Sequence, residues 1–111
     1  MPGPTTLCLG GGRFRVEVAW KDFQGGAGPG SVVPGVASDD SGLFWFFAPG
    51  NWELLVKVLD GCAVNGHHWV FAAATTTVEY TLTVTDTVTG AQREYRNPSG
   101  RFASVGDTAA F

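Results

Sequence analysis

LFWFFAPGNWELLVKVL, residues 43–59, is the segment that most clearly indicates a β protein. It contains two apolar runs, 43–47 and 52–59, joined by Pro49-Gly50-Asn51, residue types that favour tight turns. Because successive side chains of a strand point to opposite faces, an uninterrupted apolar run indicates a strand that is dry on both sides. The stretch therefore predicts two neighbouring strands, connected as a hairpin, at the centre of a β protein.

The segments around this stretch extend the β pattern. The run HHWVFAAA, 67–74, follows the turn residues Asn65-Gly66 and is again mostly apolar on both faces. Three further segments, 13–21, 78–86 and 91–97, alternate apolar and polar residues, which is typical of half-buried strands. No segment has a convincing amphipathic helical pattern. We therefore expect an all-β chain: an antiparallel β-sandwich, Ig-like or jelly-roll in style, with about seven to eight short strands.

The chain is predicted to form a single domain with an N-terminal arm, a long loop and a C-terminal tail. At 111 residues the chain has the size of one domain, and we assign all of 1–111 to it. Residues 1–12 are expected to form an N-terminal arm. Residues 22–38 are expected to form a Gly/Pro-rich loop with at most a short edge strand at 31–38, since Pro34 cannot donate to a ladder. The tail 100–111 can add one short strand.

Composition and charge exclude two classes of partner. The net charge is −3 and the seven basic residues are scattered, so no basic stripe exists to bind nucleic acid. The longest apolar runs fall far short of the roughly 20 residues that span a membrane, so we expect no membrane span. The opening MPGPTT lacks the features of a signal peptide. If the protein is exported, we expect its signal to lie outside this chain.

The chain has two cysteines, Cys8 and Cys62, each just outside a predicted strand. An even count in a small strand-rich protein favours one disulfide and an oxidising compartment, extracellular or periplasmic. The alternative is a pair of buried free thiols. No CxxC or His-rich spacing accompanies the cysteines, so they do not by themselves predict zinc.

The distribution of apolar faces is the strongest functional signal. A two-sheet sandwich needs only one dry face per sheet, yet the segments 43–47, 52–59 and 67–74 are apolar on both. The second face is covered either by the protein's own loop and tails or by another molecule. The candidate interface or ligand-binding residues are Phe44, Trp45, Phe46, Trp52 and Trp69.

Three long motifs carry a family resemblance: CLGGGRFRVEVAW at 8–20, the segment from DSGLFWFF to NGHHWVF at 40–71, and VEYTLTVTDTVTGAQREYRNPSGRFASVGDTAAF at 78–111. Together they resemble an uncharacterised module of secreted bacterial proteins, found alone or beside enzymatic and repeat domains. The resemblance implies an exported β-sandwich whose cysteines lie near the first strand and after KVLDG. It implies no activity. His68 stands where that module usually carries an aromatic residue.

Two groups of polar residues, the adjacent histidines and the aspartates before residue 43, are candidates for metal binding. His67 and His68 are adjacent in a strand, so they point to opposite faces and at most one can join a metal site with Asp60 or Asn65. Packing or surface roles explain them more simply. Asp39 and Asp40, with Ser41 and Asn51, could supply oxygen ligands to Ca²⁺, but no calcium-loop spacing is present. A turn that caps the strand at 43–47 through Asx hydrogen bonds explains the same residues more simply.

Covalent chemistry has little support in the sequence. No G-x-S-x-G or P-loop motif is present, so we expect no enzyme activity and no cofactor. Lys57, flanked by apolar residues, could form an isopeptide bond to Asn97 or Asp107, with Glu79 or Glu17 assisting. The simpler interpretation is that its methylenes cover apolar neighbours while its ammonium stays in water.

The sequence thus predicts a non-catalytic extracellular module that acts by protein–protein or self-association through an apolar sheet face. The alternative is a carbohydrate-binding module that stacks sugar rings on exposed Trp45 or Trp52 beside Asp39, Asp40 and Asn51. A remote alternative is a small metal-dependent enzyme that uses His67 or His68.

Overall fold

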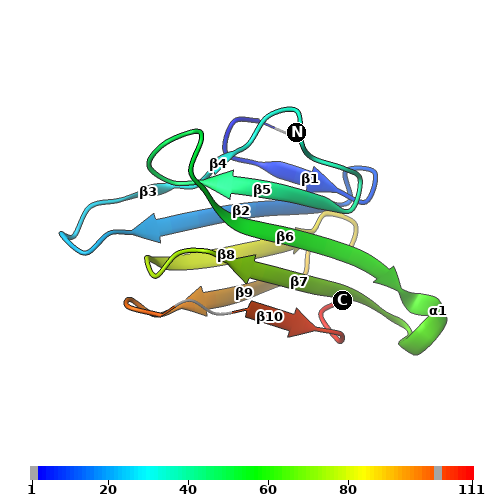
Figure 1. Cartoon of the computed structure of the whole chain (residues 1–111). Helices are drawn as coiled ribbons and strands as arrows, with labels where there is room; N and C mark the ends of the chain where they lie inside the picture. Colours follow the sequence, from blue (N-terminus) through cyan, green and yellow to red (C-terminus); the bar gives the residue numbers. More distant parts are fainter. Residues whose placement is uncertain (1–2, 102–103) are drawn as a thin grey trace.

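Two antiparallel sheets lie face to face in the computed structural model, which describes residues 3–101 and 104–111 (Figure 1). The first sheet has the order β1-β2-β8-β9, with β3 also paired to β2. Its strands are β1 Leu7–Leu9, β2 Phe14–Lys21, β3 Ala27–Pro29, β8 Glu79–Asp86 and β9 Gln92–Asn97. The second sheet has the order β10-β7-β6-β5-β4. Its strands are β4 Ser31–Val32, β5 Ser41–Trp45, β6 Trp52–Gly61, β7 His67–Ala74 and β10 Ser104–Asp107.

This arrangement confirms the all-β, sandwich-like expectation, with ten strands among the described residues. The strands missed by sequence are the short β1, inside the expected arm, and β3, inside the expected loop. Both lie against the same edge of β2, with Leu9 opposite Phe14 and Ala27 opposite Lys21. Three-residue strands are too short for an alternating pattern to be recognised. The helix α1, Cys62–Asn65, is a single turn that connects β6 to β7 at one end of the molecule (Figure 1).

The core lies between the two sheets and follows the alternation of the strands. Phe14, Val16 and Val18 on β2 face Leu54, Val56 and Val58 on β6, and all six are buried. Phe44 on β5 and Leu82 on β8 are fully buried. Cross-strand partners share a face of the sheet, so each strand contributes alternate side chains to this core.

The central hairpin differs from its sequence prediction at one point. β5 ends at Trp45, and the pairing with β6 shifts so that Phe44 lies opposite Leu54 while Trp45 lies opposite Trp52. Glu53 is the extra residue of this β-bulge and is buried, with 6% of its surface exposed. Phe46 is buried beyond the strand end, whereas the neighbouring Phe47 is 48% exposed. The five residues 43–47 therefore do not form one uniform strand.

The predicted disulfide between Cys8 and Cys62 is wrong for this structure, because both thiols are free. Cys8 lies on β1 between Leu7 and Leu9, whose side chains are buried. Strand alternation therefore directs Cys8 to the outer face of the first sheet. Cys62 begins α1 at the end of the second sheet and lies beside His68 instead.

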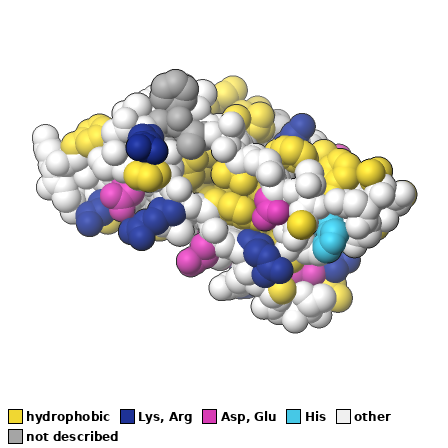
Figure 2. All heavy atoms as spheres, turned by 90° about the horizontal axis from the view of Figure 1, so that it is seen from below, with side chains coloured by type: hydrophobic (Ala, Val, Ile, Leu, Met, Phe, Trp, Pro, Cys, Tyr) yellow, Lys and Arg dark blue, Asp and Glu magenta, His cyan; other side chains and the backbone are white. Residues whose placement is uncertain are grey.

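The edges of the two sheets are joined by side-chain contacts. The Tyr95 hydroxyl on β9 donates to Asp107 Oδ2 on β10 at 2.7 Å. Burial and this carboxylate both raise the pKa of Tyr95 above its usual value. Seen from the side of these edge strands, hydrophobic side chains gather over the middle of the molecule, while charged side chains lie around them (Figure 2).

Candidate functional site

The outer face of the second sheet carries a continuous set of apolar side chains. Leu43 and Leu55 are paired on β5 and β6, and Leu59 is paired with Trp69 on β7. Phe71 follows Trp69 on the same face, with the two rings edge to face at 6.3 Å. We call these five residues, Leu43, Leu55, Leu59, Trp69 and Phe71, the outer apolar face. Leu55 is 38% exposed, and the other four are partly exposed.

Three local contacts position the side chains of this face. A Cβ at Gly61 would overlap the indole of Trp69, so the absence of a side chain there lets the indole lie on the backbone. The indole Nε1 donates to Asn65 Oδ1 at 2.9 Å. The Lys57 ammonium lies 5.8 Å from the centroid of the Phe71 ring, within cation–π range. Lys57 thus extends over its apolar neighbours, as its position in β6 suggested.

The structure does not bring together the groups considered for an isopeptide bond. Lys57 is on the outer face of the second sheet. Asn97 is buried on β9 and donates to the carbonyls of Val78 and Arg101. Asp107 accepts the Tyr95 hydroxyl.

The predicted interface residues divide into two groups. Phe44 and Phe46 are buried, with 0% and 4% of their surfaces exposed, so neither can contact a partner of the folded protein. Strand alternation turns Phe44 into the core. Trp69 belongs to the outer apolar face, and Trp45 and Trp52 are register partners near the β5–β6 turn. Trp52 is 46% exposed, and its Nε1 donates to Pro49 O.

The residues considered for calcium are not collected in one place. Asp39 and Asp40 precede β5, where Asp39 Oδ1 accepts the Gly11 amide at 2.8 Å and Ser38 Oγ accepts the Asp40 amide at 3.3 Å. Asn51 lies in the turn after β5, with its amide bonded to Ala48 O. β5 separates the two sets, so Asn51 is not a ligand partner of the aspartates.

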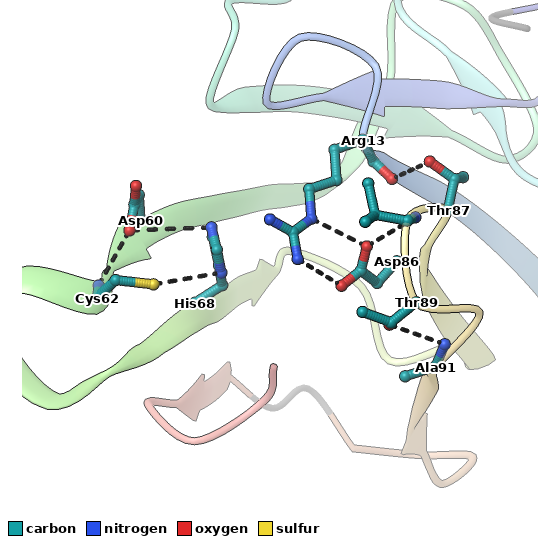
Figure 3. Close-up of polar contacts among 9 residues, drawn as sticks. Arg13, Asp60, Cys62, His68, Asp86, Thr87, Thr89 and Ala91 are labelled. Atoms are coloured by element: carbon teal, nitrogen blue, oxygen red, sulfur yellow. Dashed lines mark hydrogen bonds and ion pairs between the residues drawn. The ribbon is translucent and has the colours of Figure 1, made fainter.

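A different polar cluster lies at the α1 end of the sandwich (Figure 3). Asp60 and His68 are cross-strand partners on β6 and β7, and their side chains lie beside each other on the same face of the second sheet. Asp60 Oδ1 is 3.8 Å from His68 Nε2, and Cys62 Sγ is 3.7 Å from His68 Nδ1. Candidate ligand atoms of the three residues all lie within 4.8 Å of one another. We call Asp60, Cys62 and His68 the hairpin cluster.

Local backbone structure positions each member of the hairpin cluster. Asp60 Oδ1 accepts the Cys62 amide at 3.0 Å, an Asx-type contact that ties the end of β6 to the start of α1. The His68 backbone amide and carbonyl both pair with Phe111 at 3.3 Å. Its ring packs against Phe14 with centroids 5.0 Å apart, and its side chain is only 15% exposed. His67, by contrast, is exposed on the opposite face of β7.

The electrostatics of the cluster follow from Asp60. Hydrogen bonds from the Cys62 amide and thiol hold the pKa of Asp60 below its usual value. The same carboxylate raises the pKa of the Cys62 thiol, first because the protonated thiol hydrogen bonds to it and also because a thiolate there would place a second negative charge beside it. In the metal-free state the cluster therefore favours a carboxylate beside a protonated thiol.

A pocket of about 290 Å³ adjoins the cluster. Asp39, Asp40, Asp60 and His68 line it together with Arg13. The Arg13 guanidinium makes two hydrogen bonds to Asp86, of 2.9 and 2.8 Å, which balance its charge (Figure 3). This contact holds the pKa of Asp86 well below its usual value. Three carboxylates thus face a pocket whose one lining cation is already paired.

The sequence suggested Asp60 as a partner of one histidine but missed Cys62, because that cysteine was assigned to a disulfide. The turn residue Gly66 was visible in the sequence. A short connection that ends there joins β6 to β7 as a hairpin, and this hairpin sets Asp60 opposite His68. Asn65, the other suggested partner, instead bonds Trp69 and Thr108.

Comparisons with protein-family models, with curated proteins and with solved structures find no match for this chain. Among the residues that the structure describes, no helix is both long and apolar enough to cross a membrane.

Proposed function

We propose that the chain is a non-catalytic module that associates with a protein through the outer apolar face, and that a second copy of the chain is the partner to test first. The observation that carries the proposal is the position of Leu55, Trp69 and Phe71, which are partly exposed on strands whose opposite face already forms the core. Burying such side chains contributes about 25 cal/mol per Å² of apolar surface removed from water.

The charge of this face supports pairing with itself. Lys57 is the one charged side chain in the β6 segment 55–59, and it already lies over Phe71. A two-fold symmetric contact places the same surface on both copies, so a strongly charged face would repel itself while an apolar face does not. The sheet also presents side chains at regular spacing, which suits packing of one sheet on another.

Export to the extracellular space or periplasm is part of this proposal. With both thiols free, it rests on the resemblance to modules of secreted bacterial proteins and not on a disulfide.

Sedimentation velocity of the full chain at rising concentration tests the association. We expect the weight-average sedimentation coefficient to rise with concentration for the wild type and to stay at the monomer value for Leu55→Glu. Val88→Glu is the matched control, because Val88 is 72% exposed outside the outer apolar face. A wild type that stays monomeric up to millimolar concentration would contradict self-association.

A second candidate function is favoured by one specific observation. Trp45 and Trp52 are register partners next to the exposed β5–β6 turn, and Trp52 is 46% exposed. Two neighbouring indoles could stack a sugar ring, with Asn51 as the adjacent polar group. Asp39 and Asp40, before β5, are not part of this set. Pull-down on insoluble polysaccharides tests it: retention of wild type that is lost in Trp52→Ala, but not in Phe23→Ala, would support glycan binding.

A further inference from the structure

The hairpin cluster combines three kinds of metal ligand in one place. Asp60 offers a carboxylate oxygen, Cys62 a sulfur and His68 an imidazole nitrogen, all within 4.8 Å of one another. Sulfur and imidazole ligands select Zn²⁺ and related borderline metals, whereas Ca²⁺ and Mg²⁺ prefer sites made of oxygen ligands alone. The donor set therefore points to one class of ion.

The candidate ligand atoms lie slightly farther apart than in a tetrahedral site. Zn²⁺ bonds of 2.0–2.3 Å place neighbouring tetrahedral ligands about 3.4–3.7 Å apart. The Cys62 Sγ to His68 Nδ1 distance is 3.7 Å and the Asp60 Oδ1 to His68 Nε2 distance is 3.8 Å, but these two contacts use different ring nitrogens. A single ion binds one of the two nitrogens, and the candidate ligand atoms of the three residues lie within 4.8 Å of one another. Asp60 and Cys62 are exposed, so rotation of their side chains can bring the ligand atoms about 1 Å closer, to tetrahedral spacing.

The surroundings supply rigidity on one side and negative charge on the other. His68 is fixed by its backbone pairing with Phe111 and by its packing on Phe14. On the open side, Asp39 and Asp40 line the adjacent pocket, which has a volume of about 290 Å³. Carboxylates that line the same pocket raise the local concentration of a cation. The pocket also leaves space for a water molecule as the fourth ligand of the ion.

We propose that Asp60, Cys62 and His68 bind one Zn²⁺ ion, with water as the fourth ligand on the pocket side. The ion would link the end of β6, the start of α1 and the start of β7 across the hairpin. Zn²⁺ takes the thiolate form of Cys62, so binding releases the thiol proton to solvent. The competing interpretation is a metal-free cluster in which the Cys62 thiol hydrogen bonds to His68.

The experiment is a Zn²⁺ titration of the full chain by calorimetry, with the protein tag-free, stripped by chelator and reduced with a phosphine that does not bind metal. We expect one ion per chain, and affinity at least about tenfold weaker in Cys62→Ser, His68→Gln and Asp60→Asn. Cys8→Ser and His67→Gln are matched controls that remove the same residue types outside the cluster, and both should bind as the wild type does.

Co²⁺ added to the wild type gives a second readout that does not depend on any variant. A thiolate ligand in a tetrahedral site should produce a sulfur-to-Co²⁺ charge-transfer band and intense d–d bands, which excess Zn²⁺ removes. Absence of stoichiometric Zn²⁺ binding by the wild type, absence of the charge-transfer band, or equal affinity in Cys62→Ser and wild type would each overturn the proposal.

Discussion

Asp60 and His68 lie opposite each other on β6 and β7, and their side chains approach to 3.8 Å at the end of the sandwich where α1 links the two strands. This pairing places two side chains that can bind a metal ion on the inner face of strands that otherwise direct apolar residues into the core. It depends on register alone: a one-residue slip of β7 would turn His68 to the outer face and His67 to the inner one.

The first prediction concerns thermal stability. A ligand that binds only the folded state stabilises it by about 2.7 kcal/mol at one hundred times its Kd. For a domain of this size we expect the melting temperature to rise by on the order of 10 °C with Zn²⁺. Differential scanning calorimetry measures the shift. At the same Zn²⁺ concentration the rise in melting temperature should be clearly smaller in Cys62→Ser, because its affinity is weaker, and an equal rise in both proteins would contradict the assignment of the ligand.

The second prediction concerns the reactivity of Cys62. Because Asp60 raises the pKa of the Cys62 thiol, Asp60→Asn should lower that pKa and move the pH profile of alkylation to lower pH. Mass spectrometry of the metal-free protein, labelled with iodoacetamide at a series of pH values, measures this profile. Cys8 is the internal control. If unreduced, denatured protein takes up no label, the cysteines form a disulfide and the free-thiol arrangement is wrong.

The third prediction concerns acid stability. The Arg13 contact depresses the pKa of Asp86 in the folded state, so its contribution to stability is present above the ordinary aspartate pKa, 3.8, and is lost as pH falls below it. Asp86→Asn should therefore lower the free energy of unfolding at pH 7 and flatten its decline below pH 4. Urea denaturation across this range measures both effects.

The fourth prediction concerns the buried bulge residue Glu53. Its Oε2 atom has no hydrogen-bond partner among the described residues, and burial raises the pKa of its carboxyl above the usual 4.5. The ionised form is therefore disfavoured in the fold, and stability is lost as pH rises through the raised pKa. Glu53→Gln should be more stable than wild type at pH 7, and this gain should vanish below pH 4.5. Glu94→Gln, at an exposed position, should show no such gain.

The fifth prediction compares two phenylalanines. Phe44 is fully buried on β5, whereas Phe23 is 65% exposed. Phe44→Ala should destabilise the protein by about 3–5 kcal/mol through lost burial and the cavity it leaves. Phe23→Ala should change stability by no more than about 0.5 kcal/mol. Chemical denaturation of both variants measures the difference, and similar losses would mean that the assigned core is wrong.

The sequence was informative wherever alternation was regular. Phe14, Val16 and Val18 on β2 could be assigned to the core because polar residues separate them, and the same holds for β8. The bulge at Glu53 could not be predicted, because an extra residue changes which side chains face inward without altering composition. The outward direction of the Phe47 side chain could not be predicted either, because a continuous apolar run shows no alternation between apolar and polar residues.

The candidate sites divide in the same way. The doubly apolar character of β6 and β7 was visible in the sequence, and the outer apolar face follows from it. The hairpin cluster was visible only in part, because Cys62 was predicted to pair with Cys8 in a disulfide, whereas the structure places Cys62 beside His68. The presence of two cysteines does not show which way their side chains point. The strand β1 was too short for its alternation to show that Cys8 faces outward.

The central claim, that the module associates through the outer apolar face, is tested most directly by NMR. Amide and methyl resonances of the isotope-labelled chain would be compared between micromolar and millimolar concentrations. We expect concentration-dependent shifts clustered on the outer apolar face, Leu43, Leu55, Leu59, Trp69 and Phe71, with the outer face of the first sheet unchanged. Shifts confined to the first sheet, or no shift at any residue of the outer apolar face, would contradict it.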